Sequence, residues 1–310
     1  MRISVIICTR NRVSALLQCL GSINLAARNA ALRDAEIVVV DNGSSDDTSP
    51  AVRAWGLESY LPVVLEYEAR PGLAIARNRG IGAARGDFFV MVDDDCNLKE
   101  DYFVELLRLC SDTDELVLRG GRVELGNLQD LPLTIKTETA AKRWHLGIAS
   151  ARTENLGNCF FGCNFLMSRA VYTRLGSFDE NLGAGSPIPS CEDADYIFRA
   201  YEAGMALEYV PELVVFHHHG RRTAAEARKL LQNYVVGSGA LYTKHFFKCP
   251  SLCMQAKWDL RGAIREVFSR KNLFLPEYSF SYIDKMNCYA RGVALYLYTI
   301  TKNSWQKVRQ

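Results

Sequence analysis

The feature that most constrains the fold is an alternation of short β-branched runs with longer helical stretches over residues 1 to about 125. Strands that alternate with helices build βαβ units, and successive units form a mainly parallel sheet. The run IVVV at residues 37–40 is continuously apolar, as expected where helices cover both faces of a sheet. The predicted strands are Ile3–Cys8, Glu36–Asp41, Val63–Tyr67, Asp87–Val92 and Leu116–Val123. This pattern predicts an α/β fold.

A second ordered block follows a more polar stretch over residues 126–158, which we expect to connect the two blocks and to hold an acceptor loop. The second block is predicted to contain a strand over Cys159–Met167, helices over Arg169–Leu175 and Asp193–Ala203, and a strand over Leu213–His217. From Thr223 onward the pattern is helical. We therefore expect a sheet-forming domain over 1–220, divided near residue 125, and a helical extension over 221–310.

Composition excludes several classes of protein. The 37 Lys and Arg residues nearly balance the 35 Asp and Glu residues, giving a net charge of +2, so we expect no nucleic-acid partner. We find no secretory signal and no run near the ~20 apolar residues that cross a bilayer. The ten cysteines contain no CxxC pair, which favours reduced thiols and a cytoplasmic location. The aromatic C-terminal segments favour core packing, with peripheral contact at the inner face of the membrane as the alternative.

Three adjacent carboxylates, Asp93, Asp94 and Asp95, directly follow a buried apolar strand. Carboxylates this close repel one another and raise one another's pKa unless a cation neutralises them. Oxygen ligands suit Mg²⁺ or Mn²⁺, which also bind substrate phosphates. A solvated loop or a cap for the helix that begins near Asp101 is the alternative. The cluster also lies at the carboxyl end of a strand, where open α/β sheets bind their ligands.

Further polar residues stand at comparable positions. Asp41 closes a fully apolar strand, where a carboxylate needs a hydrogen-bond donor. Glu192 and Asp193 begin a helix after the glycine-rich segment GAGSP, and we expect them to border a cleft. Their alternative role is to stabilise the first helical turn. Of three successive histidines, His217 and His219 share one face of a strand, so at most two can join one site.

Together these residues resemble a family 2 inverting glycosyltransferase of the GT-A fold. The resemblance covers roughly residues 1–220 and is specific for the family, although it does not identify the sugar. It is carried by the ordered segments CTRNR, VVVDNGSSDDT, RPGLAIARNRGIGAARGDFFVMVDDD, FFGCNFLMSR, FDENLG, CEDADYIFRAYEAG and VPELVVFHHHG. It implies a mixed sheet flanked by helices, of the nucleotide-diphospho-sugar transferase type, with a nucleotide-binding half over about 1–125 and an acceptor half over about 126–220.

The resemblance also implies roles for the residues that bind the donor. Thr9 and Asp41 would contact uracil or thymine, and Arg77 and Asn78 would approach the base and the pyrophosphate. The aspartate triplet matches the DxD motif of the family. In that motif Asp93 would meet the ribose and Asp95 would coordinate the metal, with Asp94 between them in the nucleotide-sugar site.

The remaining roles concern the acceptor and the leaving group. The resemblance makes Asp193 the general base and Glu192 an acceptor ligand or an alternate base. His217 would assist Mn²⁺ or Mg²⁺ or the diphosphate, with the register relative to His219 left open. Such an enzyme would move a sugar from a UDP- or dTDP-sugar to a hydroxyl of a glycan or a lipid-linked acceptor, in cell-envelope polysaccharide or glycoconjugate synthesis.

Three other functions can be weighed against this one. A nicotinamide dehydrogenase needs GxGxxG after the first strand, and Thr9–Ser14 contains no glycine, so we set that function aside. A sugar nucleotidyltransferase needs a similar metal but usually has a glycine-rich loop at this position. A non-catalytic protein that binds nucleotide sugars would retain the pocket without turnover. The last two stay open as alternatives.

Overall fold

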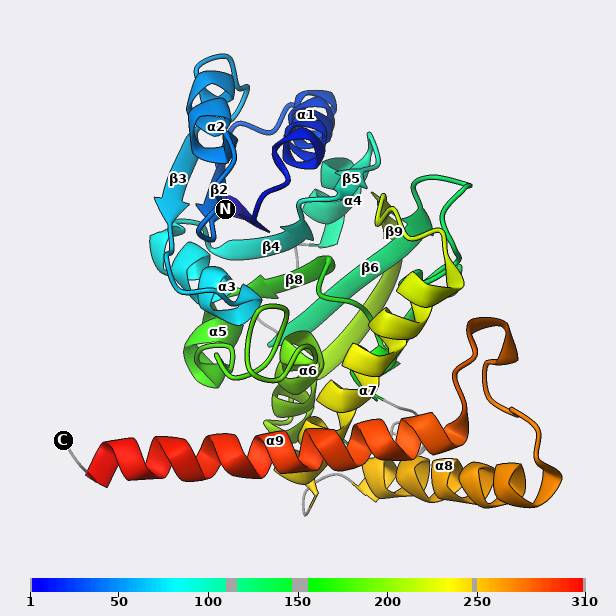
Figure 1. The fold of residues 1–310 in the computed structure, drawn as a ribbon. Coiled ribbons are helices and arrows are strands. Elements are labelled where there is room, and N and C mark those ends of the chain that lie inside the picture. The colour runs from blue at the N-terminus through cyan, green and yellow to red at the C-terminus, as the bar shows by residue number, and fades with distance from the viewer. Residues whose placement is uncertain (1, 110–115, 147–155, 247–249, 309–310) are drawn as a thin grey trace.

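A computed structural model describes residues 2–109, 116–146, 156–246 and 250–308 (Figure 1). The described strands form one mixed sheet in the order β3-β2-β1-β4-β8-β6-β9-β5, with β7 paired to β9. Helices pack on both faces of this sheet, and three further helices follow it in the chain. The expected mixed α/β sheet with a helical C-terminal extension is confirmed.

The amino-terminal strands are parallel, as predicted. They are β1 (Ile3–Thr9), β2 (Ala35–Asp41), β3 (Val63–Tyr67) and β4 (Phe88–Asp93). Along β1, Val5 and Ile7 pack into the core beneath α1 (Val13–Asn29), α2 (Thr48–Gly56) and α4 (Tyr102–Leu109). Ile6 packs into the opposite core, toward α3 (Leu73–Ala83). Alternate strand residues therefore fill two cores, which explains the continuous apolar runs.

The second half of the sheet is mixed. β8 (Asn164–Ser168) is antiparallel to β4 and to β6 (Val117–Leu125), whereas β6 is parallel to β9 (Ala206–His217). Two short strands that the sequence pattern does not predict, β5 (Cys96–Leu98) and β7 (Lys142–Trp144), pair antiparallel with β9. Part of the predicted connecting region, residues 147–155, lies outside the described residues.

The strand predicted over Cys159–Met167 is wrong in its first half, because β8 begins at Asn164. The preceding residues follow a short 3₁₀ helix, η2 (Leu156–Asn158), and pack against the sheet without joining it. A Cβ atom on Gly120 of β6 would lie 2.1 Å from Cγ of Phe160. The apolar character of this segment therefore reflects burial of Phe160 against a glycine rather than strand pairing.

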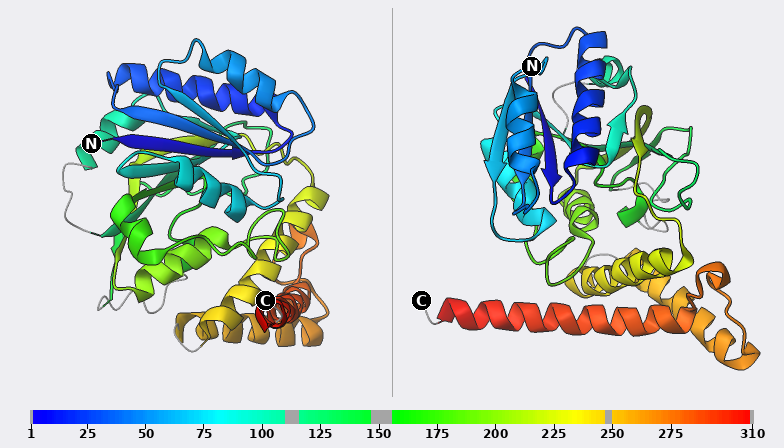
Figure 2. Two further views of the ribbon diagram at one scale, coloured as in Figure 1. Left: turned by 90° about the vertical axis from the view of Figure 1, so that its left-hand side faces the viewer. Right: turned by 45° about the horizontal axis from the view of Figure 1, so that its top comes forward.

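Two helices flank this half of the sheet: α5 (Arg169–Leu175) and α6 (Glu192–Glu202). After β9 the chain forms α7 (Ala224–His245), α8 (Pro250–Ser269), the 3₁₀ helix η3 (Pro276–Tyr278) and α9 (Tyr282–Val308). Figures 1 and 2 show α8 and α9 side by side at the end of the molecule opposite α1 and α2. In the described residues no helix is both long enough and apolar enough to span a bilayer.

Candidate active site

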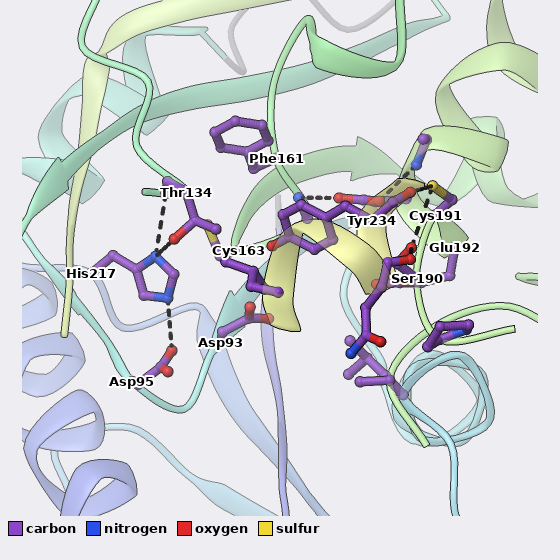
Figure 3. Close-up of a pocket in the computed structure, with 18 of the residues that line it drawn as sticks. Asp93, Asp95, Thr134, Phe161, Cys163, Ser190, Cys191, Glu192, His217 and Tyr234 are labelled. Atoms are coloured by element: carbon purple, nitrogen blue, oxygen red, sulfur yellow. Dashed lines mark hydrogen bonds and ion pairs between the residues drawn. The ribbon is translucent and has the colours of Figure 1, made fainter. Parts of the chain in front are cut away.

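A cavity of about 980 Å³ opens at the carboxyl ends of β1, β4 and β9. One side, which we name the strand-end wall, carries Thr9, Arg12, the aspartate triplet and His217. The facing side, which we name the helix wall, carries Glu192 and Asp193 of α6 and Tyr234 of α7. Figure 3 shows Asp93, Asp95 and His217 across from Glu192 and Tyr234. The structure therefore brings the predicted metal-binding acids and the predicted base into one cavity.

Asp94 is buried and turned toward the first strand. Its carboxylate accepts hydrogen bonds from the Thr9 hydroxyl at 2.7 Å and from the Arg12 guanidinium at 3.0 Å. Burial raises the pKa of Asp94 to about 6, against the opposing charge of Arg12 and the bond from Thr9. Parallel pairing of β1 with β4, with Cys8 opposite Asp93, fixes this meeting of the two strand ends.

Asp95 binds both Arg12 and a histidine. Its carboxylate lies 2.9 Å from Arg12 Nη1 and 3.3 Å from His217 Nε2. Burial opposes ionisation, but the hydrogen bond and charge of His217 and the charge of Arg12 outweigh it and lower the pKa of Asp95 to about 2. Burial alone would lower the pKa of His217, but the hydrogen bond to Asp95 and the charges of Cys163, Asp95 and Asp93 together outweigh it and raise the pKa to about 9. Nδ1 of His217 contacts Thr134, so the ring is held at both nitrogens (Figure 3).

The structure distinguishes the three histidines. His217 faces Asp95. His219 Nε2 contacts the Leu131 carbonyl at 3.0 Å, and its Nδ1 accepts a hydrogen bond from the Arg221 backbone. His218 contacts the Asn97 amide at 3.2 Å. His217 and not His219 is therefore the histidine beside Asp95, the predicted metal ligand.

Arg77 connects the two walls of the cavity. Its guanidinium lies 2.9 Å from Glu192 and 3.3 Å from Asp93, and it donates to the Gly162 carbonyl at 3.1 Å. Burial would lower the pKa of Arg77, but the charges of Glu192 and Asp93 raise it well above its usual value. Burial, followed by the charge of Asp193, raises the pKa of Glu192 to about 7. A permanently charged Arg77 thus stands between one carboxylate of each wall.

Asp193 is held by backbone groups. One carboxylate oxygen accepts from the Gly162 N–H at 2.8 Å, and the other accepts from the Ala194 N–H at 2.7 Å. Its carboxylate is half-buried and lines the cavity. The third acid of the segment, Asp195, is fully buried and binds Lys244, His245 and Arg199 at 2.8 to 3.0 Å. Asp195 therefore joins α6 to the end of α7 instead of facing the cavity.

Two residues expected to contact the nucleotide have other partners in the structure. The Asp41 carboxylate accepts hydrogen bonds from the Ser44 backbone N–H at 2.8 Å and the Ser49 hydroxyl at 2.5 Å. The Asn78 amide exchanges two hydrogen bonds with the backbone of Phe178. Asp41 thus orders the loop after β2, and Asn78 joins α3 to the segment before the glycine-rich loop. Their predicted contacts with the donor receive no support from this geometry.

The chemistry of the strand-end wall fits a hard divalent cation. Carboxylates suit Mg²⁺ and Mn²⁺, and imidazole is a common ligand of transition metals. Asp95 and His217 already place a carboxylate oxygen and a ring nitrogen 3.3 Å apart. Asp93 keeps about a third of its side chain exposed beside them. The donor atoms of these residues therefore suit Mn²⁺ or Mg²⁺.

Sequence reasoning missed two residues of the site. Arg12 was quoted only within the segment CTRNR, although it binds both Asp94 and Asp95. Its position was a usable signal, because Arg12 follows the strand β1 and the aspartate triplet ends and follows the strand β4. Residues at the carboxyl ends of parallel strands meet at one edge of the sheet. Tyr234 belongs to the helical extension and lies more than 100 residues after the aspartate triplet in the sequence. No local pattern therefore indicates that both line one cavity. Only the packing of α7 beside α6 brings it there.

The chain is similar to a known family and to individual proteins. The model described as glycosyl transferase family 2 matches residues 4–176. The succinoglycan biosynthesis protein ExoM of Rhizobium meliloti (strain 1021) is 27% identical over 305 residues, which cover 85% of this chain and 90% of ExoM. The putative glycosyltransferase EpsH of Bacillus subtilis (strain 168) is 29% identical over 117 residues, which cover 37% of this chain and 32% of EpsH. The match therefore spans about a third of EpsH's own length.

A solved structure supports the fold. The mannosyltransferase PcManGT from Pyrobaculum calidifontis, in complex with GDP-Man and Mn²⁺, superposes with a TM-score of 0.61 at 19% identity. The superposition covers 99% of this chain and 88% of that one. At this identity the likeness concerns the fold, including the C-terminal helices as well as the sheet.

Proposed function

The chain belongs to glycosyl transferase family 2 and is a glycosyltransferase, and from this premise we propose that it moves a sugar from a nucleoside diphosphate to an acceptor hydroxyl with inversion at the anomeric carbon. The observation that carries the proposal is the pairing of two unlike walls in one cavity. The strand-end wall offers ligands for a cation and a diphosphate. The helix wall offers Asp193 as a base.

On the strand-end wall the residues handle negative charge. Asp95 and His217 would hold Mn²⁺ or Mg²⁺, and the bound cation would supply Lewis-acid neutralisation of the departing diphosphate. Arg12 lies beside the same carboxylates, and Thr9 orients Asp94 by a 2.7 Å bond. We assign Asp93 to the ribose and Asp94 to the ordering of the triplet within the donor site.

On the helix wall one residue removes a proton. Asp193 takes the proton of the acceptor hydroxyl as that oxygen attacks the anomeric carbon from the face opposite the diphosphate. The N–H of Gly162, 2.8 Å from the carboxylate, fixes the orientation of the base. Because the base and the diphosphate-binding residues face each other, attack and departure occur on opposite faces, which inverts the anomeric centre.

Glu192 has a supporting role in this proposal. Its carboxylate is buried and 2.9 Å from Arg77, so it positions that guanidinium instead of receiving the proton. Arg77 lines the cavity, and its guanidinium is well placed to stabilise the negative charge that develops on the diphosphate. Glu192 is therefore a positioning residue, and Asp193 is the base.

The substrates are proposed by class. We expect a UDP- or dTDP-sugar donor and a glycan or lipid-linked acceptor. We place the reaction in polysaccharide synthesis, because ExoM is named as a succinoglycan biosynthesis protein. PcManGT carries GDP-Man, so a guanosine donor belongs in the same test.

The experiment is a binding and transfer panel. Purified protein is titrated calorimetrically with UDP-, dTDP- and GDP-sugars, with Mn²⁺ or with a chelator, and products are analysed for anomeric configuration by NMR. We expect one donor to bind only with the cation and to give the inverted product. Formation of a nucleoside diphosphate sugar from a nucleoside triphosphate and a sugar 1-phosphate, with release of pyrophosphate, would instead identify a nucleotidyltransferase. Binding of a donor without any turnover across an acceptor panel would favour a non-catalytic protein.

We also propose that the protein contacts the inner face of the membrane through α8. Both carboxylates of this helix, Asp259 and Glu266, are buried, where Lys285 lies 2.8 Å from Asp259 and the backbone of Leu273 bonds to Glu266 at 2.8 Å. The exposed surface of α8 therefore carries no acid among its described side chains. That surface, together with the exposed Arg270 directly after the helix, is named the α8 face and consists of Lys257, Trp258, Leu260, Arg261, Ile264, Arg265, Val267, Phe268 and Arg270.

The composition of the α8 face favours an anionic lipid surface as its partner. Phe268 is 85% exposed and Val267 is 63% exposed, which is costly for apolar side chains in water. Arg261 stacks 5.0 Å from the centre of the Trp258 ring. Bulky apolar residues mixed with cations, and without exposed acids, are typical of helices that lie in the plane of a membrane interface. The expectation of plain core packing for this part of the extension therefore receives no support from α8.

Vesicle sedimentation tests this contact. The full chain should sediment with phosphatidylglycerol-containing vesicles more than with phosphatidylcholine vesicles, and salt should weaken the binding. The variant with Lys257, Arg261 and Arg265 each changed to Gln should lose most of it. The control Lys99→Gln, an exposed cation near the opposite end of the molecule, should not. Equal sedimentation of all three proteins would reject the α8 face as the contact.

A further inference from the structure

Two buried thiols, Cys96 and Cys163, lie beside His217 of the strand-end wall. Cys96, Cys163 and His217 each offer one ligand atom, and these atoms all lie within 4.8 Å of one another. Asp95 Oδ1 is 3.3 Å from His217 Nε2 and 4.0 Å from Cys96 Sγ. In the part of the chain that the structure describes, this is the single group of this kind.

The fold fixes this arrangement. Cys96 of β5 is the direct register partner of His217 of β9, so their side chains share one face of the antiparallel pair. Cys163 precedes the first residue of β8 and reaches the same point from the middle of the sheet. Figure 3 shows Cys163 between Asp93 and the His217 ring. Two strands and the residue just before a third thus contribute one ligand group each.

We infer that these residues form a binding site for a thiophilic divalent cation such as Zn²⁺, with Cys96, Cys163 and His217 as ligands and Asp95 as the fourth. Zn–S bonds of about 2.3 Å in a tetrahedral site place two sulfur atoms about 3.8 Å apart, which small side-chain rotations reach from the observed separations. Binding replaces the two thiol protons, which pass to solvent. The donor set of two sulfurs, one nitrogen and one oxygen is of the kind that Zn²⁺ binds.

The cation would enter from the cavity. Asp95, Cys163 and His217 all line it, whereas Cys96 lies behind them and is fully buried. Cys19 provides a contrast, because it is equally buried in the same core but belongs to no group of three potential metal ligands among the described residues. Burial of a thiol alone therefore does not make the site.

The site has a consequence for catalysis that rests on the proposed function. Asp95 and His217 would serve both Mn²⁺ or Mg²⁺ and the thiophilic cation, so the two cannot be bound productively together. Thiolates select soft metals, whereas carboxylates and phosphates select hard ones. Zn²⁺ would therefore act as a competitive inhibitor with respect to Mn²⁺, held by two residues that play no part in transfer.

Cobalt provides a spectroscopic test that does not depend on activity. The reduced, chelator-treated chain is titrated with Co²⁺, and we expect a thiolate-to-cobalt charge-transfer band in the near ultraviolet that Zn²⁺ removes. Cys96→Ser and Cys163→Ser should each lose the band and weaken Zn²⁺ binding at least about 10-fold, while Cys19→Ser keeps both. Weak octahedral cobalt bands alone in the wild-type protein would overturn the inference.

A second measurement needs no variant. A thiolate bound to Zn²⁺ is not free to react, so Zn²⁺ should slow alkylation of Cys163 at least about 10-fold, the same size of effect as the affinity change above. Alkylation of Cys191, which also lines the cavity, should keep its rate. Equal protection of both thiols, or of neither, would reject the site. If the cobalt band is absent but Mn²⁺-dependent donor binding is present, the thiol site fails and the proposed function stands. The reverse result would retain the site and reject the function.

Discussion

The two walls of the cavity are built in different ways. On the strand-end wall, backbone pairing sets the positions: Cys8 is paired with Asp93 between β1 and β4, and Cys96 with His217 between β5 and β9. On the helix wall, α6 is placed by side chains, since Asp195 binds Lys244 and His245 of α7. α7 in turn packs against α9.

This difference separates two tasks. The strand-end wall concentrates carboxylates and offsets them with Arg12 and His217, an arrangement suited to a cation and a diphosphate. The helix wall presents Asp193 bound to backbone N–H groups, an arrangement suited to accepting a proton. In the proposed mechanism the sheet edge therefore handles charge, and a helix held by a distant part of the chain supplies the base.

The largest expected effect separates the two walls directly. Asp193→Asn keeps an oxygen for the Gly162 N–H but removes the base, so the transfer rate should fall about 10²- to 10⁴-fold. Donor binding, measured by calorimetry, should stay unchanged. A rate within about threefold of wild type, well below the usual effect of a general base, would remove Asp193 from the mechanism.

The converse change affects the strand-end wall. Asp95→Ala removes the carboxylate between Arg12 and His217, and we expect metal-dependent donor affinity to fall at least about 100-fold, beyond the range typical for residues that only support a ligand. The control Asp47→Ala changes an exposed acid after β2 and should leave affinity unchanged. Unaltered affinity of the Asp95 variant, with the same response to Mn²⁺, would contradict the assigned ligand.

The support of the helix wall can be loosened at the crossing of α7 with α9. A Cβ atom on Gly292 would lie 2.0 Å from the Val236 carbonyl, so Gly292→Ala should cost about 1–3 kcal/mol in urea unfolding. It should lower the transfer rate more than donor affinity. Gly21→Ala is the matched control, because nothing lies within 4 Å of the added atom and the helix should gain about 0.5–1 kcal/mol. Equal unfolding midpoints for the two variants would show that this crossing is not tightly packed.

The smallest expected effect is the pH-dependent part of the contribution that Asp195 makes to the free energy of unfolding. Burial opposes its ionisation, but the bond from His245 and the charges of Lys244 and Arg199 outweigh it and lower the pKa of Asp195 to about 2. A carboxyl whose pKa is lower in the folded state stabilises the fold above its unfolded pKa near 3.8, and this contribution is lost as the pH falls toward 2. The stability difference between wild type and Asp195→Asn should therefore narrow by about 1 kcal/mol from pH 6 to pH 3. A constant difference over this range would mean that Asp195 is not bound in its ionised form.

Much of the strand-end wall could be predicted from the sequence. Each of Thr9, Asp93, Asp95 and His217 ends or follows a strand whose apolar run is visible in the residues. Parallel strands bring their carboxyl ends to one edge, so the meeting of these residues follows from the pattern. The choice of His217 over His219 did not follow, because both lie on one face and only the pairing with β5 distinguishes them.

The alternation of strands and helices in the first 125 residues, the acids at the strand ends and the helical nature of the last part of the chain were determined by the sequence itself, since local periodicity and burial act over a few residues. The tertiary structure decided what crosses long separations: that Arg12 binds the triplet, that Asn78 is used within the fold, and that α7 forms a wall of the cavity. Such contacts depend on which surfaces come together after the sheet has formed, and no local pattern records that.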